Sequence, residues 1–283
     1  MERQKELDLA GKVVVITGVS RGMGRLAALM FARRGANLVL AARTVERDAS
    51  LAGGTIGDTL EEARALGAKA IAVQTDLANR DDLRNLVDTA VKQFGGVDIL
   101  VNNAAATAGA MWDKRFLDLS YEEWLYQFDV NLHAPFLLMQ MVVPIMEARG
   151  GGRIINITSG SAEALGLVAE PVKLESIAGQ NLIVPGYHAS KRALDRLSNT
   201  IAGDLAARNI YVISMHPGWV ATERVSQHLE GVSEGAMGGH KPVPMSTPAR
   251  MMVYFAACEN PQEYTGRIFW AEREMADMGI PDE

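Results

Sequence analysis

The sequence contains one cysteine, Cys258, among 283 residues. A single thiol cannot form a disulfide within the chain, so the fold does not depend on an oxidising compartment. The residues around it, 256–260, resemble a helix end, which favours a packed structural thiol over a nucleophile. The first six residues are charged and lack the apolar stretch of a secretory signal. These absences predict a cytoplasmic protein.

The sequence also lacks long apolar runs and an excess of positive charge. No apolar run approaches the roughly 18 residues that cross a bilayer. The 28 Lys and Arg residues against 34 Asp and Glu give a net charge of −6. Nucleic acids and anionic membranes bind basic surfaces, so neither is an expected partner. The apolar share of 48% and the charged share of 22% are typical of a globular protein.

Short β-branched runs alternate with helical patterns along the chain. Strands are predicted at 12–17, 37–42, 69–74, 97–102, 153–157, 210–215 and 267–270. Helices are predicted at 24–34, 56–66, 81–94, 121–148 and after Tyr187. Apolar strands separated by helices form βαβ units, whose parallel sheet is covered on both faces. The sequence predicts one α/β domain over residues 1–283, a doubly wound parallel sheet of about seven strands.

Three segments interrupt this alternation: 48–58, 163–186 (within a loop at 160–186) and 219–246. Loops that follow parallel strands lie at the carboxyl edge of the sheet, where ligands bind. We expect the second and third segments to be substrate loops. Surface insertion is the alternative for all three, and it stays fully open for 48–58.

A glycine-rich segment, 17–24, lies between the first predicted strand and the first predicted helix. Glycine permits a sharp turn and a close approach of backbone to a pyrophosphate, and the helix N-terminus supplies N–H groups. The spacing is Gly-x3-Gly-x-Gly and differs from the Gly-x-Gly-x2-Gly fingerprint. A purely structural turn is the alternative. The candidate phosphate-binding residues are Gly18, Ser20, Arg21, Gly22, Met23 and Gly24.

Four motifs together resemble those of the short-chain dehydrogenase/reductase family. They are Thr-Gly-x3-Gly-x-Gly at 17–24, Asn-Asn-Ala within 101–105, Tyr-x3-Lys at 187–191 and Pro-Gly-x-Val-x-Thr at 217–222. They follow one another in the family's order and cover most of the chain. The resemblance implies a Rossmann-type NADP(H)- or NAD(H)-binding fold. It also implies adenosine contacts from Asp76, Leu77 and Asn103, and contacts of Val220 and Thr222 with the nicotinamide carboxamide.

The end of the second predicted strand indicates which cofactor is used. An NAD enzyme usually places Asp or Glu there to bind the ribose hydroxyls. Here the strand ends Ala-Ala-Arg, and the arginine is Arg43. Together with Arg21, it suits the 2′-phosphate of NADP(H), because guanidinium groups bind phosphate through bidentate contacts. Two solvated arginines are the alternative.

Tyr187 and Lys191 are four residues apart, so a helix places them on one face. Free tyrosine has a pKa near 10. A nearby ammonium and the charge of an oxidised nicotinamide would lower that pKa, so the phenol could exchange a proton with a substrate oxygen. Lys191 would also hold the nicotinamide ribose. By the resemblance, Tyr187 is the catalytic acid/base and His216, which precedes the 217–222 motif, is a packed residue.

Two further residues complete the catalytic tetrad that the resemblance implies. Ser159 would hydrogen-bond the substrate oxygen, although it lies 28 residues before Tyr187, roughly twice the usual family gap. Ser161 and Ser176 are alternatives, and Ser159 is favoured because a predicted strand directly precedes it. Asn131 would hold a water that relays protons to the lysine, with a packing role as its alternative.

The predicted function is reversible NADP(H)-dependent hydride transfer between a secondary alcohol and a ketone or aldehyde. Apolar residues in 219–246 favour an apolar or cyclic substrate. Alternatives are a related enzyme acting on C=C or C=N bonds, and a cofactor-binding sensor or scaffold without turnover. No metal is predicted. A homo-oligomer, tetramer or dimer, is expected from the family, but the segment 272–274 replaces the usual C-terminal family motif, which weakens the tetramer prediction.

Overall fold

The computed structural model describes residues 8–46, 54–106, 116–159, 185–220, 222–223 and 243–280. Seven strands form one sheet in the order β3-β2-β1-β4-β5-β6-β7, and every neighbouring pair is parallel. The strands are β1 (Val13–Thr17), β2 (Asn37–Ala42), β3 (Ala70–Gln74), β4 (Ile99–Asn102), β5 (Gly152–Ile157), β6 (Ile210–His216) and β7 (Ile268–Trp270). The predicted fold class is confirmed.

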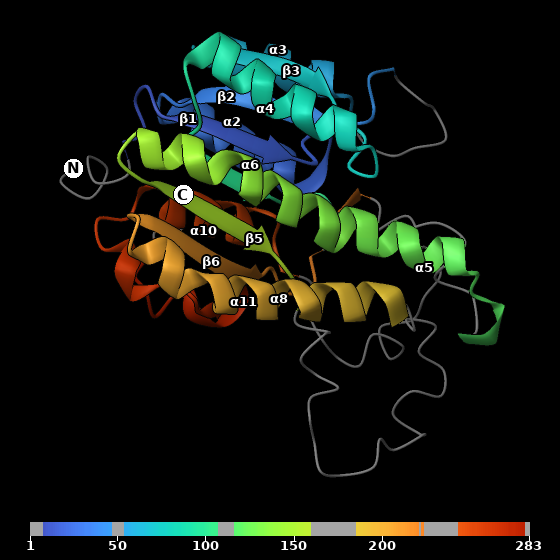
Figure 1. The fold of residues 1–283 in the computed structure, drawn as a ribbon. Helices are drawn as coiled ribbons and strands as arrows, with labels where there is room; N and C mark the ends of the chain where they lie inside the picture. Colours follow the sequence, from blue (N-terminus) through green and yellow to red (C-terminus); the bar gives the residue numbers. More distant parts are fainter. Residues whose placement is uncertain are drawn as a thin grey trace.

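Helices cover both faces of the sheet (Figure 1). One face carries α2 (Gly22–Arg33), α3 (Ile56–Ala65) and α10 (Ser246–Ala257). The other carries α4 (Arg80–Phe94), α5 (Tyr121–Phe128), α6 (Ala134–Ala148) and α8 (Pro185–Ala206). The short elements are η1 (Phe116–Asp118), η5 (Pro261–Glu263) and α11 (Ala271–Glu274).

The sequence of β1, VVVIT, shows why the central strands form. All five residues are buried, and β-branched side chains suit a pleated surface that is packed on both faces. Successive side chains point to opposite faces, so Val14 and Ile16 join the core under α2 and α10, while Val13 and Val15 join the core under α4 and α6. Two hydrophobic cores therefore share one sheet.

The predicted helix at 121–148 is present but is not regular. It consists of α5, the five-residue π-helix η2 (Asp129–His133) and α6. The continuous stretch Tyr121–Ala148 is the one described helix that is long and apolar enough to cross a membrane. Here its side chains Leu138, Val142 and Met146 are buried in the core between α6 and the sheet.

Several boundaries differ from the prediction. Helix α8 begins at Pro185 and so includes Tyr187, and β4 begins at Ile99, two residues later than expected. Only the end of helix α10 was predicted, near Cys258; its start was not, because the sequence STPARMMVYFAA contains an early proline and follows a Gly- and Pro-rich stretch. Residues 163–184 of the predicted loop 163–186 and most of 219–246 lie outside the described residues, and residues 185 and 186 are helical, not loop. The end of 48–58 forms the capped first turn of α3.

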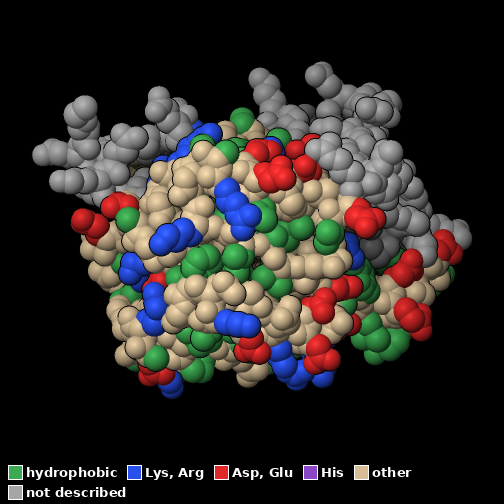
Figure 2. Space-filling view, turned by 90° about the horizontal axis from the view of Figure 1, so that it is seen from above, with side chains coloured by type: hydrophobic (Ala, Val, Ile, Leu, Met, Phe, Trp, Pro, Cys, Tyr) green, Lys and Arg blue, Asp and Glu red, His purple; other side chains and the backbone are tan. Residues whose placement is uncertain are grey.

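The surface carries charges of both signs. On the face shown in Figure 2, Lys and Arg side chains are interspersed with Asp and Glu and with apolar side chains. This mixture on the visible face agrees with the modest net charge of −6.

Candidate active site

The predicted motifs meet at one edge of the sheet. Strands β1, β4, β5 and β6 end at Thr17, Asn102, Ile157 and His216. The motifs at 17–24, 101–105 and 217–222 adjoin the ends of β1, β4 and β6. The Tyr-x3-Lys motif packs against the end of β5. The arrowheads of β5 and β6 point the same way in Figure 1, as their parallel pairing requires. Carboxyl ends of parallel strands are where open α/β sheets bind ligands.

The glycine loop has a backbone that only glycine adopts easily. Gly18 has φ 74° and Gly22 has φ 61°, both in the left-handed region. The N–H of Gly18 donates to the carbonyl of Ala41 at the end of β2 (2.8 Å), which fixes the turn to the sheet. A Cβ on Gly18 would lie 2.8 Å from the Cα of Ala104. A larger residue there would push the loop away from β4.

Asn103 braces this loop from behind. Its Nδ2 donates to the carbonyls of Thr17 (2.8 Å) and Gly18 (3.2 Å), and its side chain is almost fully buried. A Cβ on Gly24 would lie 2.2 Å from this same Nδ2 and 2.4 Å from the Gly18 oxygen. The third glycine of the motif therefore leaves space for the Asn103 side chain, whose hydrogen bonds fix the backbone of the loop.

The N-terminus of α2 faces the loop. No acidic residue lies in its first turn, and the Arg21 side chain at the N-cap makes no capping hydrogen bond. The 217–222 motif reaches the same place, because a Cβ on Gly22 would lie 3.4 Å from Cγ2 of Thr222 and 3.6 Å from Oε2 of Glu223. The first turn of α2 has no acidic residue of its own, which suits a phosphate group, although the Glu223 carboxylate lies beside the start of the helix. Ser20 is buried and Met23 packs against the core.

A hollow of about 240 Å³ lies beyond β2 and β3, lined by Arg43, Gln74, Asp76 and Asp82. Gln74 Nε2 donates to the carbonyl of Arg43 (3.3 Å), and Arg43 Nη1 donates to the hydroxyl of Tyr126 on α5. The backbone N–H of Asp76 donates to Asp82 (2.8 Å). Arg43 and Asp76 therefore share one hollow, as the prediction of an adenosine site requires, and the neighbouring Leu77 is buried in the core.

The catalytic candidates gather around the start of α8 and the end of β5. Tyr187 and Ser159 share a side-chain hydrogen bond. Lys191, one helical turn beyond Tyr187, is 1% exposed, and its Nζ donates to the carbonyl of Ile157 (2.7 Å). The favoured serine thus lies beside the tyrosine in spite of the long gap between them. The alternatives Ser161 and Ser176 lie outside the described residues.

Burial controls the ionisation of both groups on α8. Burial raises the pKa of Tyr187, and the hydrogen bond with Ser159 opposes this rise. Burial lowers the pKa of Lys191 from 10.5 to about 8, and the negative charge of Asp195 opposes that fall. The sequence predicted a lowered Tyr187 pKa for a complex with oxidised nicotinamide. In the protein alone the shift has the opposite sign, because desolvation of the phenolate dominates.

Asn131 lies in the middle of the π-helix η2 and is fully buried. Its Oδ1 accepts from the N–H of Ala106 (2.8 Å), and its Nδ2 donates to Oγ of Ser190 (3.1 Å). Ser190 in turn donates to the carbonyl of Tyr187 (2.9 Å). A π-turn often marks a functional position in a helix. Here it connects the segment after β4 with the turn of α8 that carries the tyrosine.

Sequence reasoning missed one buried pair next to this site. His216, expected to be a packed residue, is indeed fully buried, but its Nε2 lies 3.1 Å from Oδ2 of Asp195. Asp195 follows Lys191 by four residues, so helical spacing alone would have placed it on the same face. Ser190 was also missed. Among the described residues, no group of three His, Cys, Asp or Glu side chains could hold a metal.

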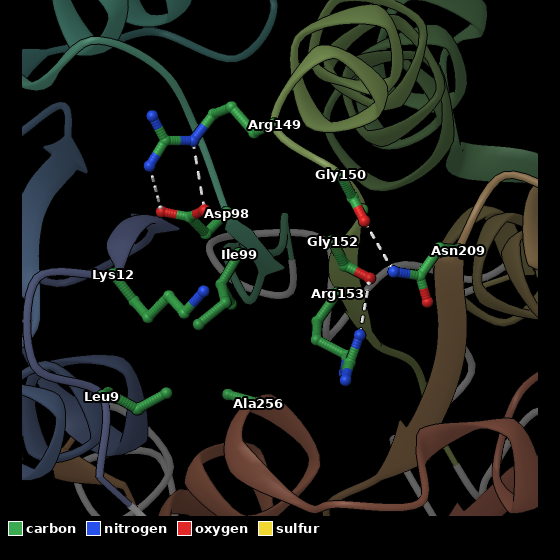
Figure 3. Close-up of a pocket in the computed structure, with 11 residues that line it drawn as sticks. Leu9, Lys12, Asp98, Ile99, Arg149, Gly150, Gly152, Arg153, Asn209 and Ala256 are labelled. Carbon is green, nitrogen blue, oxygen red and sulfur yellow. Dashed lines mark hydrogen bonds and ion pairs between the residues drawn. The ribbon is translucent and has the colours of Figure 1, made fainter.

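A second hollow, of about 190 Å³, lies at the opposite edge of the sheet (Figure 3). Asp98 accepts from Arg149 Nε (3.1 Å) and Nη2 (2.9 Å) and from the N–H of Val13 (2.8 Å). On the other side, Asn209 donates to the carbonyl of Gly150 (2.6 Å). These contacts connect the amino ends of β1, β4 and β6 and lie away from the catalytic candidates.

Comparison with known proteins identifies the family. A model of the short chain dehydrogenase family matches residues 12–232. The chain belongs to this family. It is 32% identical to 7alpha-hydroxysteroid dehydrogenase of Escherichia coli (strain K12) over 243 residues, which cover 86% of this chain and 84% of that protein. Membership makes this protein an oxidoreductase of the short-chain dehydrogenase/reductase type.

Two similar solved structures contain different cofactors. A 7α-hydroxysteroid dehydrogenase complexed with NADH and 7-oxo glycochenodeoxycholic acid has a TM-score of 0.73 and 28% identity, covering 94% of each chain. L-sorbose reductase from Gluconobacter frateurii complexed with NADPH and L-sorbose has the same TM-score and identity, covering 94% of this chain and 96% of that one. Family membership therefore leaves the choice between NADH and NADPH to this chain's own residues.

Proposed function

We propose that this protein is an NADP(H)-dependent dehydrogenase/reductase that interconverts a secondary alcohol and a ketone or aldehyde. The observation that carries the proposal is the hydrogen bond between Tyr187 and Ser159, with the buried Lys191 one helical turn away. Two hydroxyl groups that contact each other at the carboxyl edge of the sheet can both reach one substrate oxygen.

In the reduction direction, Tyr187 donates its proton to the carbonyl oxygen. Ser159 donates a hydrogen bond to the same oxygen and stabilises the charge that develops there. When bound, NADPH would supply the hydride. The high pKa of Tyr187 in the buried site keeps the phenol protonated, which is the form that reduction needs. Lys191, whose pKa is about 8, carries its charge at neutral pH and stabilises the phenolate after the proton has left.

The glycine loop fits a dinucleotide. Its left-handed glycines and the first turn of α2 leave backbone N–H groups for a pyrophosphate, to be bound by Gly18, Ser20, Arg21, Gly22, Met23 and Gly24. Asp76 and Leu77 would contact the adenine, Asn103 would support the adenosine side, and Val220 and Thr222 would hold the carboxamide. Lys191 and Tyr187 would contact the nicotinamide ribose. Asn131 would hold the proton-relay water.

The preference for NADP(H) rests on charge at the end of β2. The last residues of the strand are Ala41 and Ala42, and Arg43 follows at the hollow that also contains Asp76. An NAD enzyme places an acidic residue at this strand end to bind the ribose hydroxyls, and this strand end has none. Arg43 and Arg21 are the cations that would bind the 2′-phosphate.

The substrate class is a small molecule with an apolar or cyclic carbon skeleton. Val243 is buried, and it forms a β-bridge with Val220 of the motif that would hold the carboxamide. This supports an apolar wall near the reacting carbon. Met245, also expected in this segment, is half-buried just before α10, whereas Val225, Leu229, Val232 and Met237 lie outside the described residues.

The proposal includes a cytoplasmic homo-oligomer. The single cysteine is buried, which agrees with a reducing compartment. Five apolar side chains of η1, α5 and α6 are at least 37% exposed: Phe116, Leu117, Tyr121, Leu125 and Phe136. Exposed apolar side chains on neighbouring elements support self-association.

The test is NADPH oxidation at 340 nm with a panel of ketones and aldehydes, with NADH in parallel. We expect Tyr187→Phe to lose turnover by about 100-fold or more, because the proton donor is removed, while the glycine loop and Lys191 keep most of the NADPH affinity. Arg43→Ala should reduce the preference for NADPH over NADH about tenfold or more. Turnover that survives in Tyr187→Phe would refute the mechanism. Wild-type protein that binds NADPH tightly but turns over no carbonyl would favour a non-catalytic sensor.

A further inference from the structure

Two ionisable side chains are buried beside the catalytic candidates without a role in the proposed chemistry. Asp195 on α8 is 1% exposed, and His216, the last residue of β6, is 0% exposed. Removing charged groups from water is unfavourable, and a buried ion pair is a weak source of stability even when its geometry is good. Buried ionisable groups gather at functional sites more often than elsewhere.

The spacing along α8 places Asp195 in line with the catalytic candidates. Tyr187, Lys191 and Asp195 follow one another at intervals of four residues, so they lie along one face of the helix. Asp195 is the charged group that opposes the effect of burial on the Lys191 ammonium. Its influence on Lys191 is therefore electrostatic and acts within the helix.

Two neighbouring contacts connect this helix face to the sheet. Lys191 Nζ donates to the carbonyl of Ile157 at the end of β5 (2.7 Å). One turn further along, Asp195 Oδ2 lies 3.1 Å from His216 Nε2 at the end of β6. The two strand ends are themselves joined, because the N–H of Thr158 donates to the carbonyl of Met215 (2.9 Å). His216 thus holds the Asp195 carboxylate one helical turn from Lys191.

The surroundings keep His216 fixed. Its ring meets the edge of the Trp270 ring at 5.0 Å, with an interplanar angle of 82°. Two residues after it, Gly218 has φ 81°, and a Cβ there would lie 2.7 Å from Val243. The 217–222 turn, which would hold the carboxamide, therefore directly follows His216, the residue that contacts Asp195.

We propose that Asp195, held in place by His216, is a positioning residue that keeps the Lys191 ammonium charged and oriented for the cofactor ribose and the tyrosine. This inference rests on the proposed function. It assigns Asp195 no contact with substrate or cofactor, since its effect passes through Lys191.

Other charged groups near the pair are few among the described residues. Arg192 on α8 approaches Asp195 Oδ2 at 3.9 Å, but its side chain is half exposed. On α11, Glu272 Oε2 lies 3.5 Å from the position of a Cβ on Gly218, and Arg273 stacks on the Trp270 ring at 4.2 Å. Tyr187 and Lys191 lie on the same face of α8 as Asp195. Arg192 and Arg273 are exposed, so water screens their charges. Asp195 is the buried carboxylate that lies closest in sequence to Lys191.

Removal of a nearby negative charge favours proton loss from an ammonium and from a phenol alike. Asp195→Asn therefore makes deprotonation of the coupled Tyr187–Lys191 pair easier, whichever of the two titrates. His216→Gln keeps the carboxylate and removes any positive charge of the imidazole, so it makes that deprotonation harder or leaves it unchanged.

The experiment measures NADPH affinity against pH from 6 to 10, using energy transfer from protein tryptophan to NADPH, for the full chain and each variant. Binding weakens as Lys191 loses its proton. We expect the midpoint of this loss to fall by about one pH unit in Asp195→Asn. In His216→Gln we expect it to stay or to rise. The alkaline limit of cyclohexanone reduction should move in the same directions.

The matched control is Ser198→Ala, a buried change on the same face of α8. Ser198 accepts from Asn156 Nδ2 (2.8 Å), so this variant loosens the helix without changing charge. It should leave the midpoint in place. A midpoint unchanged in Asp195→Asn, or shifted equally in the control, would overturn the inference. Failure of wild type to bind NADPH or NADH would instead overturn the proposed function.

Discussion

Replacing Lys191 by methionine should abolish activity and yet make the protein more stable. The side chain is 1% exposed, and its burial lowers its pKa from 10.5 to about 8. One pKa unit corresponds to about 1.4 kcal/mol, so keeping the ammonium charged in the folded protein at pH 7 costs about 3 kcal/mol. Methionine has a similar length and no charge. The variant loses the hydrogen bond to the carbonyl of Ile157, which contributes about 1 kcal/mol.

The net expectation is a gain of about 2 kcal/mol in the free energy of unfolding at pH 7. The gain should depend on pH with a definite sign. The folded-state pKa of Lys191 lies below the unfolded value, so the unfolded chain binds more protons between about pH 8 and pH 10.5. The stability of the wild type therefore rises across this range, and the advantage of Lys191→Met should nearly vanish by about pH 10.

Urea denaturation followed by circular dichroism at pH 7 and pH 10 would measure this difference. Lys92→Met is the matched control, because Lys92 is exposed on α4 and its replacement should change stability little at either pH. If Lys191→Met is less stable than wild type at pH 7, or if its advantage persists at pH 10, the ammonium is not destabilising the fold. The pKa argument would then be wrong.

Two further predictions concern structure away from the proton donor. Asp98→Asn should lower the free energy of unfolding by about 3 kcal/mol, because it breaks the pair with Arg149. Urea denaturation would measure this loss, and NADPH affinity should not change. The control Asp81→Asn, at an exposed pair, should have little effect on stability. Gly24→Ala should weaken NADPH binding about tenfold or more in a fluorescence titration, since its Cβ would meet Asn103 at 2.2 Å. Asn103→Ala in the same chain should not restore binding, because a backbone carbonyl obstructs the same Cβ at 2.4 Å; restored binding would show that the side chain alone sets the limit.

The sheet could be predicted because its strands are short apolar runs. β2 has the predicted bounds, and β1, β3, β5, β6 and β7 each differ from theirs by one residue. Buried parallel strands need apolar side chains on both faces, and this leaves a local signal in the sequence. Helix α10 left a weaker signal, because Pro248 and the preceding Gly- and Pro-rich stretch suggest a loop. Packing of α10 against α2 outweighs that local preference.

The site divides in the same way. Tyr187 and Lys191 could be placed on one helix face from spacing alone, and Ser159 from the strand before it. The partners of these groups could not be predicted. The contact of His216 with Asp195 joins residues 21 positions apart on different elements, and only the packing of α8 on β6 brings them together. Sequence spacing reports neighbours within an element, whereas contacts between elements depend on the whole fold.

The π-helix η2 sets the rotational phase of the long helix around it. An α-helix advances about 100° per residue, so the one extra residue of a π-turn rotates everything before it relative to everything after it. Helix α5 can therefore turn one side toward α8 while α6 turns a different side toward α4. Deletion of one residue from Asp129–His133 would restore regular geometry and swing Tyr126 away from Arg43. The length of η2 therefore determines which side of α5 faces α8, and so it contributes to the site together with Asn131.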